Sequence, residues 1–263
     1  MVNNEWNRGK CTNLLTRQFD YTCSSLSPEG RLFQIEYAEK AVETSSTILG
    51  VVCKDGIIMG TEKIVSNKMM VSGTDKRLYS LSLSSGGVIN GVIPDGRSVI
   101  QRGREEAVQY RSQFHIPIPN AVLAERMSLR FQMNTIYNGQ RPLGTSLIMA
   151  SHDNMKGRQL FMVEPSGTMF QFYGCASGRG KQMARNEIEK TKFRDMTVEE
   201  SLPLVAKILL KCQEEMKDKK QELEISFISE SSGNKHKILD RKTVDELTSS
   251  ALRDIGGEDA EMK

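Results

Sequence analysis

The amino-acid sequence predicts an α+β fold in which two antiparallel β-sheets carry helices on their outer faces. Strand hairpins followed by a pair of helices occur in the first half of the chain, and the same order returns in the second half. An amphipathic helix precedes the first strand. A chain of 263 residues can bury a sizeable core and does not force more than one domain. We therefore expect a single domain with an additional N-terminal helix.

Composition and charge argue against several classes of protein. The formal net charge of +3 gives no electrostatic case for binding nucleic acid. No stretch approaches the ~20 apolar residues of a membrane-spanning helix, and the first 18 residues are too polar for a signal peptide. The five cysteines are scattered without a CxxC pair or a Cys/His cluster. This pattern predicts neither a zinc site nor a disulfide framework, and it favours a reducing compartment. The sequence also contains no cofactor motif.

The helix before the first strand has a clear predicted start. Ser27 can cap it, Pro28 suits the first helical position, and Glu29 favours the positive end of the helix dipole. Apolar side chains then recur at helical spacing and form a broad apolar face: Leu32, Phe33, Ile35, Tyr37, Ala41 and Val42. Composition alone favours a helix that packs on its own domain.

The other elements follow from apolar runs and turn signals. Strands are predicted at 47–53, 57–61, 78–81, 88–92, 146–150, 160–163, 169–173 and 223–228, with a turn around 84–87. Helices are predicted at 95–113, 120–137, 181–192 and 198–217, and a short one is possible at 242–253. The predicted organisation is a mobile N-terminal tail at 1–26, a domain at 27–228 and a C-terminal tail at 229–263.

The run from Ser27 to Ala38 resembles the N-terminal signature of the proteasome alpha-type subunits, although Leu26 replaces the usual Phe. Further runs similar to that family follow in order: Thr47-x-Leu49-Gly50, Lys54-Asp55-Gly56, Glu62-Lys63, Arg141 to Gly144, Pro165 to Gly167 and Gly174 to Gly178. Each is weak alone, but together they are specific. Within the family, the chain looks most like the type that occupies the seventh position of the ring.

The resemblance implies a four-layer αββα sandwich of the N-terminal-nucleophile hydrolase type. It also implies a non-catalytic subunit of the 20S core, in a ring of seven different alpha subunits stacked on beta-ring subunits. Such rings template assembly, gate the axial pore and receive regulatory particles. Unfolded proteins pass through the pore in ATP- and ubiquitin-dependent degradation. The implied location is the cytoplasm and nucleus, with no membrane, nucleic acid or cofactor involved.

The resemblance also assigns roles to particular residues. A pore gate cluster matches Phe19, Asp20, Tyr21, Pro28 and Tyr37. A pocket that holds an activator's C-terminal carboxylate between adjacent subunits matches Leu32, Lys76 and Arg77, where arginine replaces the usual lysine. The helix that docks on neighbouring subunits uses Leu32, Phe33, Ile35 and Val42.

An alternative function is an active self-processing amidohydrolase of the same fold. Ser46 falls at the position of the nucleophile, Glu62 at the nearby acidic position and Arg77 at that of the essential lysine. The Ser46 nitrogen, however, is a non-basic peptide nitrogen, and residues 43–45 do not resemble a Gly-Thr or Gly-Ser cleavage junction. Arginine also stays protonated and cannot tune a nucleophile. A non-catalytic subunit is therefore the preferred interpretation.

A third hypothesis is an RNA-binding module. It rests on five cations of the predicted helices: Arg102, Arg104, Arg111, Lys181 and Arg185. Acidic neighbours accompany them, so solvated helix faces account for them better.

Overall fold

The computed structural model describes residue 23 and residues 25–64, 69–71, 73–137, 139–153, 156–212 and 221–261. These residues form two five-stranded sheets, both antiparallel, with strand orders β10-β9-β2-β1-β8 and β3-β4-β5-β6-β7. The first sheet contains β1 (Ile48–Val52), β2 (Gly56–Ile64), β8 (Gly174–Ser177), β9 (Gln221–Ser229) and β10 (His236–Ile238). The second contains β3 (Leu78–Ser80), β4 (Ser85–Ile89), β5 (Leu147–Asp153), β6 (Gly157–Val163) and β7 (Met169–Phe172).

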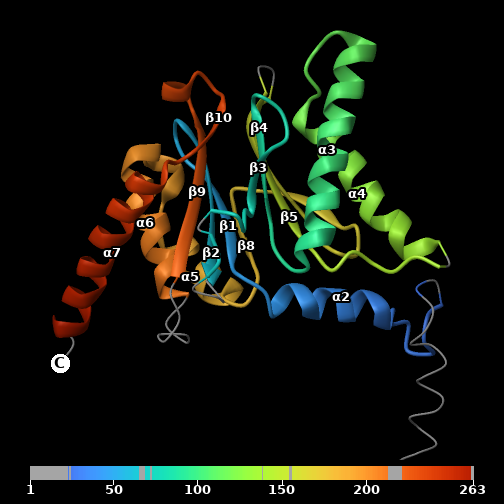
Figure 1. Ribbon diagram of the computed structural model, residues 1–263, viewed down its shortest axis with the longest axis horizontal. Coiled ribbons are helices and arrows are strands. Elements are labelled where there is room, and N and C mark those ends of the chain that lie inside the picture. The colour runs from blue at the N-terminus through green and yellow to red at the C-terminus, as the bar shows by residue number, and fades with distance from the viewer. Residues whose placement is uncertain are drawn as a thin grey trace, which may run out of the picture.

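The sheets lie face to face between two layers of helices (Figure 1). The outer face of the second sheet is covered by α3 (Ile93–Phe114) and α4 (Asn120–Ile136). The outer face of the first sheet is covered by α5 (Lys181–Lys190), α6 (Val198–Lys211) and α7 (Arg241–Glu261). Below both sheets in this view lies α2 (Phe33–Glu43), drawn in blue. The predicted four-layer αββα sandwich with an extra N-terminal helix is confirmed.

The strand β5 shows why the buried strands have continuous apolar sequences. Leu147 and Met149 pack in the core beneath α3 and α4, while Ile148 and Ala150 pack between the two sheets. Successive side chains of a strand point to opposite faces, so a strand covered on both sides needs apolar residues at every position.

One predicted turn is wrong. Residues 84–87 were expected to form it, but β4 begins at Ser85 and pairs with β3 and β5. A Cβ atom on Gly86 would come within 2.2 Å of the His236 ring. The glycine therefore permits a close approach between the sheets and does not mark a turn.

The C-terminal part of the chain is more structured than its composition indicates. The segment 229–263, expected to be a tail, contains β10, the 3₁₀-helix η4 (Glu230–Ser232) and α7. Val244 and Ala251 of α7 are buried in the core beside the first sheet. The edge strand β8 was not predicted, and α6 ends at Lys211, earlier than predicted.

Candidate functional site

The predicted helix start at Ser27 is wrong, because residues 27–31 form a closed turn and α2 begins only at Phe33. The Ser27 N–H donates to the Arg31 carbonyl at 2.9 Å, and the Arg31 N–H donates to the Ser27 hydroxyl oxygen at 3.1 Å. Gly30 has φ +76°, which interrupts a helix but which glycine readily adopts. Ser27 therefore fixes the direction in which the chain reaches α2.

The helix α2 buries one side against its own domain. Val42 is buried, and so is Ala38 one turn earlier. Leu32, Phe33 and Ile35, assigned by the resemblance to docking, each keep part of their surface exposed. The exposed apolar surface thus lies near the N-terminal end of α2, and Val42 packs within its own chain.

Only two of the five residues assigned to the pore gate lie among the described residues. Phe19, Asp20 and Tyr21 lie outside them. Pro28 is exposed in the turn before α2. Tyr37 is 52% exposed, and its ring stacks on Phe33 with centroids 6.5 Å apart. Both Pro28 and Tyr37 therefore lie at the surface of the chain.

Beyond the C-terminal end of α2, charged side chains gather around Arg77. Its guanidinium pairs with the Asp75 carboxylate through Nε to Oδ1 at 3.3 Å and Nη2 to Oδ2 at 3.2 Å. Its Nη1 lies 3.5 Å from the Ser46 hydroxyl oxygen. The Arg77 side chain is 13% exposed, whereas Lys76 is an exposed residue.

An ion pair between buried Lys63 and partly buried Glu224 holds the backbone on which Arg77 lies. Lys63 Nζ is 2.8 Å from Glu224 Oε1 and donates to the Asp75 carbonyl at 2.8 Å. The other Glu224 oxygen accepts the N–H groups of Arg77 and Leu78 at 2.9 and 3.3 Å. Lys63 belongs to β2 and Glu224 to the adjacent strand β9, so neighbouring strands fix this segment.

The roles of Asp75 and Glu224 are missing from the sequence-based predictions. A signal for the second was present, because Glu222 and Glu224 alternate with Leu223 and Ile225 along the strand and must share one face. Asp75 carried no signal, since a carboxylate two residues before an arginine is ordinary on a surface loop.

Leu32 and Arg77 lie at opposite ends of α2, although the resemblance assigns both to one pocket. Leu32 precedes the helix, while Ser46 beside Arg77 follows it. An 11-residue helix is about 16 Å long. One chain therefore does not bring the two residues together, and a pocket that contains both needs two adjacent subunits.

Ser46 and Glu62 do not form a catalytic pair. Buried Glu62 accepts both the Thr47 N–H, at 3.0 Å, and the Thr47 hydroxyl, at 2.8 Å. The same Thr47 hydroxyl oxygen accepts the Gly180 N–H at 3.0 Å. Glu62 thus anchors the start of β1 to β2 and α5.

The backbone around Ser46 is held on both sides. Arg179 donates from its side chain to the Thr44 carbonyl and from its N–H to the Ser45 carbonyl, both at 3.0 Å. Asn90 donates to the Ser46 carbonyl at 3.4 Å. The chain passes without a break from α2 into β1, so Ser46 has no free amino group that could act as its base.

The buried cysteines have the properties of core residues. Burial raises the pKa of Cys175 to about 12 and that of Cys53 to about 11, so neither thiol is an activated nucleophile. Within the described part of the chain, no group of three His, Cys, Asp or Glu side chains could hold a metal ion. Among the same residues, no helix is both long and apolar enough to cross a membrane.

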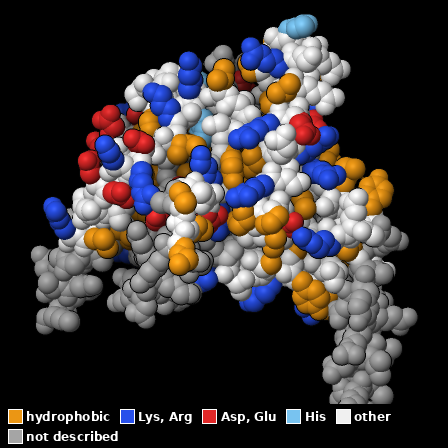
Figure 2. Space-filling model, viewed as in Figure 1, with side chains coloured by type: hydrophobic (Ala, Val, Ile, Leu, Met, Phe, Trp, Pro, Cys, Tyr) orange, Lys and Arg blue, Asp and Glu red, His pale blue; other side chains and the backbone are white. Residues whose placement is uncertain are grey.

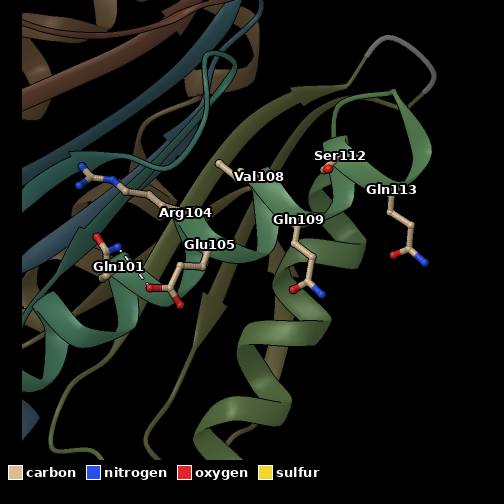
Figure 3. A pocket seen from close by; sticks show the side chains of 7 residues that line it. All are labelled: Gln101, Arg104, Glu105, Val108, Gln109, Ser112 and Gln113. Carbon is tan, nitrogen blue, oxygen red and sulfur yellow. Dashed lines mark hydrogen bonds between the residues drawn. The ribbon is translucent and has the colours of Figure 1, made fainter.

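A hollow over α3 lacks the character of a ligand site (Figure 3). All of its lining comes from this one helix: Gln101, Arg104, Glu105, Val108, Gln109, Ser112 and Gln113. Gln101 donates to Glu105 at 3.3 Å, but most of the side chains point away from one another. A small-molecule site needs polar groups that converge from several elements.

Basic side chains are mixed with apolar and acidic ones on the face shown in Figure 2. Of the cations behind the RNA-binding hypothesis, Arg102 pairs with Glu105 and Glu106 on its own helix. Lys181 pairs with Glu43 at 2.6 Å. These pairs support the interpretation of solvated helix faces.

Comparisons with known proteins cover nearly the whole chain. Residues 42–228 match the family model described as proteasome subunit, and residues 19–41 match the N-terminal signature of the A-type proteasome subunits. The alpha type-3 proteasome subunit of Dictyostelium discoideum is 41% identical over 93% of this chain and 97% of its own length. The alpha type-3 subunit of Spinacia oleracea is 40% identical over 92% and 97%. The probable alpha type-7 subunit of Saccharomyces cerevisiae is 37% identical over 92% and 85%.

Proposed function

Since the chain belongs to the alpha-type subunits of the proteasome, as a non-catalytic ring component of the 20S core, we propose that it gates the pore and docks activator particles. It assembles with other proteasome subunits. In this proposal they are the other alpha subunits of a heteroheptameric ring and the beta-ring subunits below it. The substrates are unfolded proteins of the cytoplasm and nucleus, delivered by the ATP- and ubiquitin-dependent pathway.

The observation that carries this proposal is that the candidate gate and pocket residues lie at opposite ends of α2. Its N-terminal end is preceded by Leu32 and by the turn that contains Pro28, and the matched signature extends back through Phe19. Its C-terminal end is followed by Ser46, whose side chain lies beside Arg77. In a ring that sets the turn of one subunit beside Arg77 of the next, each subunit boundary contains both a gate contact and a carboxylate pocket.

The proposed gate depends on hydrogen bonds to a charged acceptor. Asp20 is the acceptor and the Tyr37 hydroxyl a donor, while Phe19 provides a ring without a hydroxyl group. A hydrogen bond to a charged group contributes roughly 1.5–3 kcal/mol, enough to bias a two-state tail by more than tenfold. The missing hydroxyl makes this chain's share of the open-state bonding smaller than that of a ring member with tyrosine there.

Two changes in assembled particles test the gate. Asp20→Ala should hinder activator-driven opening without affecting assembly, because it removes the latch of the open state. Deletion of residues 1–18 should raise basal hydrolysis of a short fluorogenic peptide, because it removes the plug. Asp245→Ala on the far helix α7 is the matched control. Unchanged basal and activated rates in both test variants would exclude this tail from gating.

Arg77 is the proposed receptor for the activator's carboxylate. Its planar fork can bind both oxygens of a carboxylate, so it can replace a lysine. Arg77→Ala should weaken activator binding and reduce its salt dependence, while Arg77→Lys should retain most of both. An Arg77→Ala particle with unchanged affinity and salt dependence would remove the pocket from this proposal.

A further inference from the structure

We propose that Asp75 is a built-in competitor for the carboxylate that Arg77 receives, so that this chain closes its own half of the pocket. An activator's C-terminal carboxylate must then displace Asp75 before it can bind. The inference rests on the proposed role of Arg77 and adds to it a means of regulation within the same chain.

The geometry of the pair is that of a ligand already in place. Asp75 presents its two oxygens to Nε and Nη2 of Arg77 at 3.3 and 3.2 Å. This side-on arrangement is the one in which a guanidinium binds a free carboxylate. The side chains of Arg77 and Asp75 are 13% and 24% exposed, so little of the guanidinium remains open to a second carboxylate.

The backbone that carries Asp75 and Arg77 is held in place, which keeps their side chains close together. The Asp75 carbonyl is held by Lys63, whose side chain is 5% exposed, and the Arg77 N–H is held by Glu224. Both anchors belong to strands of the first sheet. Because Asp75 and Arg77 are presented by a fixed segment, closing their contact costs little additional conformational entropy.

The contact is also weak enough to open. Charge-assisted N–H···O bonds are usually about 2.7–2.9 Å long, and both bonds of this pair are longer than that. Asp75 lies two residues from Arg77 on a loop, so it can rotate away without moving a strand. A competitor that binds moderately and can leave by rotation of its side chain is suited to reversible control.

The expected consequence is a reduced apparent affinity at this position of the ring. When a binding group is available for only a fraction of the time, the apparent dissociation constant is the intrinsic one divided by that fraction. Availability of about one tenth would weaken binding about tenfold. This pocket would then fill mainly with tails of an activator already bound elsewhere on the ring, where the local concentration is high.

The test uses assembled 20S particles and a photoreactive peptide with the C-terminal sequence of the activator. The peptide is prepared with a free C-terminal carboxylate and, separately, with a C-terminal amide. Cross-linking to this chain is measured against peptide concentration by mass spectrometry, with the other alpha subunits of the same particle as internal reference. Asp75→Asn keeps the side-chain shape and removes the charge. It should lower the half-saturating concentration of the free acid about tenfold and leave that of the amide unchanged.

The remaining variants separate the two proposals. Asp245→Asn removes the same charge from an exposed position on α7 and should change nothing. If Arg77→Ala lowers cross-linking of the acid but Asp75→Asn leaves it unchanged, Arg77 binds the carboxylate but Asp75 does not compete for it. If Arg77→Ala has no effect, the pocket itself fails. An equal gain for acid and amide in Asp75→Asn also overturns the competitor. Should Asp75→Asn not assemble, Asp75→Ser is judged by the same criteria.

Discussion

His236 Nδ1 lies 2.8 Å from the Ser80 hydroxyl oxygen and so joins the edge strands of two different sheets, β10 of the first and β3 of the second. The backbone N–H of His236 also donates to the Leu83 carbonyl at 2.9 Å. The Nε2 atom of the ring is buried and has no hydrogen-bond partner among the described residues. Burial lowers the pKa of His236 to about 4, so the imidazole is neutral at pH 7.

The stability of the chain should therefore fall as the pH drops from about 6.5 to about 4. An unfolded histidine has a pKa of about 6.5 and the folded one of about 4, so protons bind the unfolded chain first in this window. The contribution is complete above pH 6.5, and at most about 3 kcal/mol is lost by pH 4. Thermal unfolding at several pH values measures it. His236→Gln should flatten the profile, and a change at exposed His115 to Asn should not. If the stability of a His236→Gln chain depended on pH as that of the wild type does, His236 would not be the cause of the loss.

Gly86→Ala should destabilise the chain through the same ring. A Cβ at this position would lie 2.2 Å from His236 Cδ2, and overpacking of this kind typically costs about 1–3 kcal/mol. Combining it with His236→Ala removes the clash, so the double variant should be less destabilised than the sum of the single variants. Urea denaturation measures the coupling, and strictly additive effects would count against the contact.

Two neighbouring hydroxyl groups should differ in importance. Ser46→Ala should leave peptide hydrolysis by the particle unchanged, because Ser46 is not a nucleophile. Thr47→Val should destabilise the chain by about 1–3 kcal/mol, because buried Glu62 loses a donor and the Gly180 N–H loses its acceptor. Peptidase assays and thermal unfolding distinguish the two variants. Loss of a peptidase activity in Ser46→Ala would contradict a non-catalytic subunit.

Ile35→Asp should block incorporation into the ring. Ile35 is partly exposed on α2, and docking would bury an unpaired carboxylate there at a cost of several kcal/mol. Lys40→Asp places the same carboxylate on an exposed position of the same helix and should assemble. Native mass spectrometry of purified particles gives the yield of each. Full-size Ile35→Asp particles at normal yield would show that this face does not dock.

The architecture was predictable because the strands that are buried on both faces have unmistakable sequences. Leu147 to Ala150, for example, are apolar at every position, and a short apolar run of this kind is typical of a strand that is buried on both faces. Two predictions were wrong beside a glycine: the helix start at Ser27 and the turn at residues 84–87. A glycine can serve a turn or a close contact, and the sequence does not tell these roles apart. Gly30 ends a turn and delays α2, whereas Gly86 makes room for a histidine 150 residues later.

Of the candidate site, only the residues that match a motif of the family could be predicted. Arg77 was assigned in this way, but its partner Asp75 was not, because a salt bridge on a loop depends on backbone geometry. Glu224 could not be connected with Lys63 for a different reason. The pairing of β2 with β9 joins segments far apart in sequence, and periodicity does not determine strand order.

The ion pair between Lys63 and Glu224 also has a consequence for the time at which this chain can mature. The two residues are separated by 161 positions, so a ribosome adding 5–20 residues per second needs roughly 10–30 seconds between them. Until Glu224 has left the ribosome, the ammonium group of Lys63 lacks this carboxylate, and β2 lacks its neighbour β9. The surface around Arg77 therefore takes its final shape only after Glu224 has been synthesised, although Arg77 itself is made much earlier.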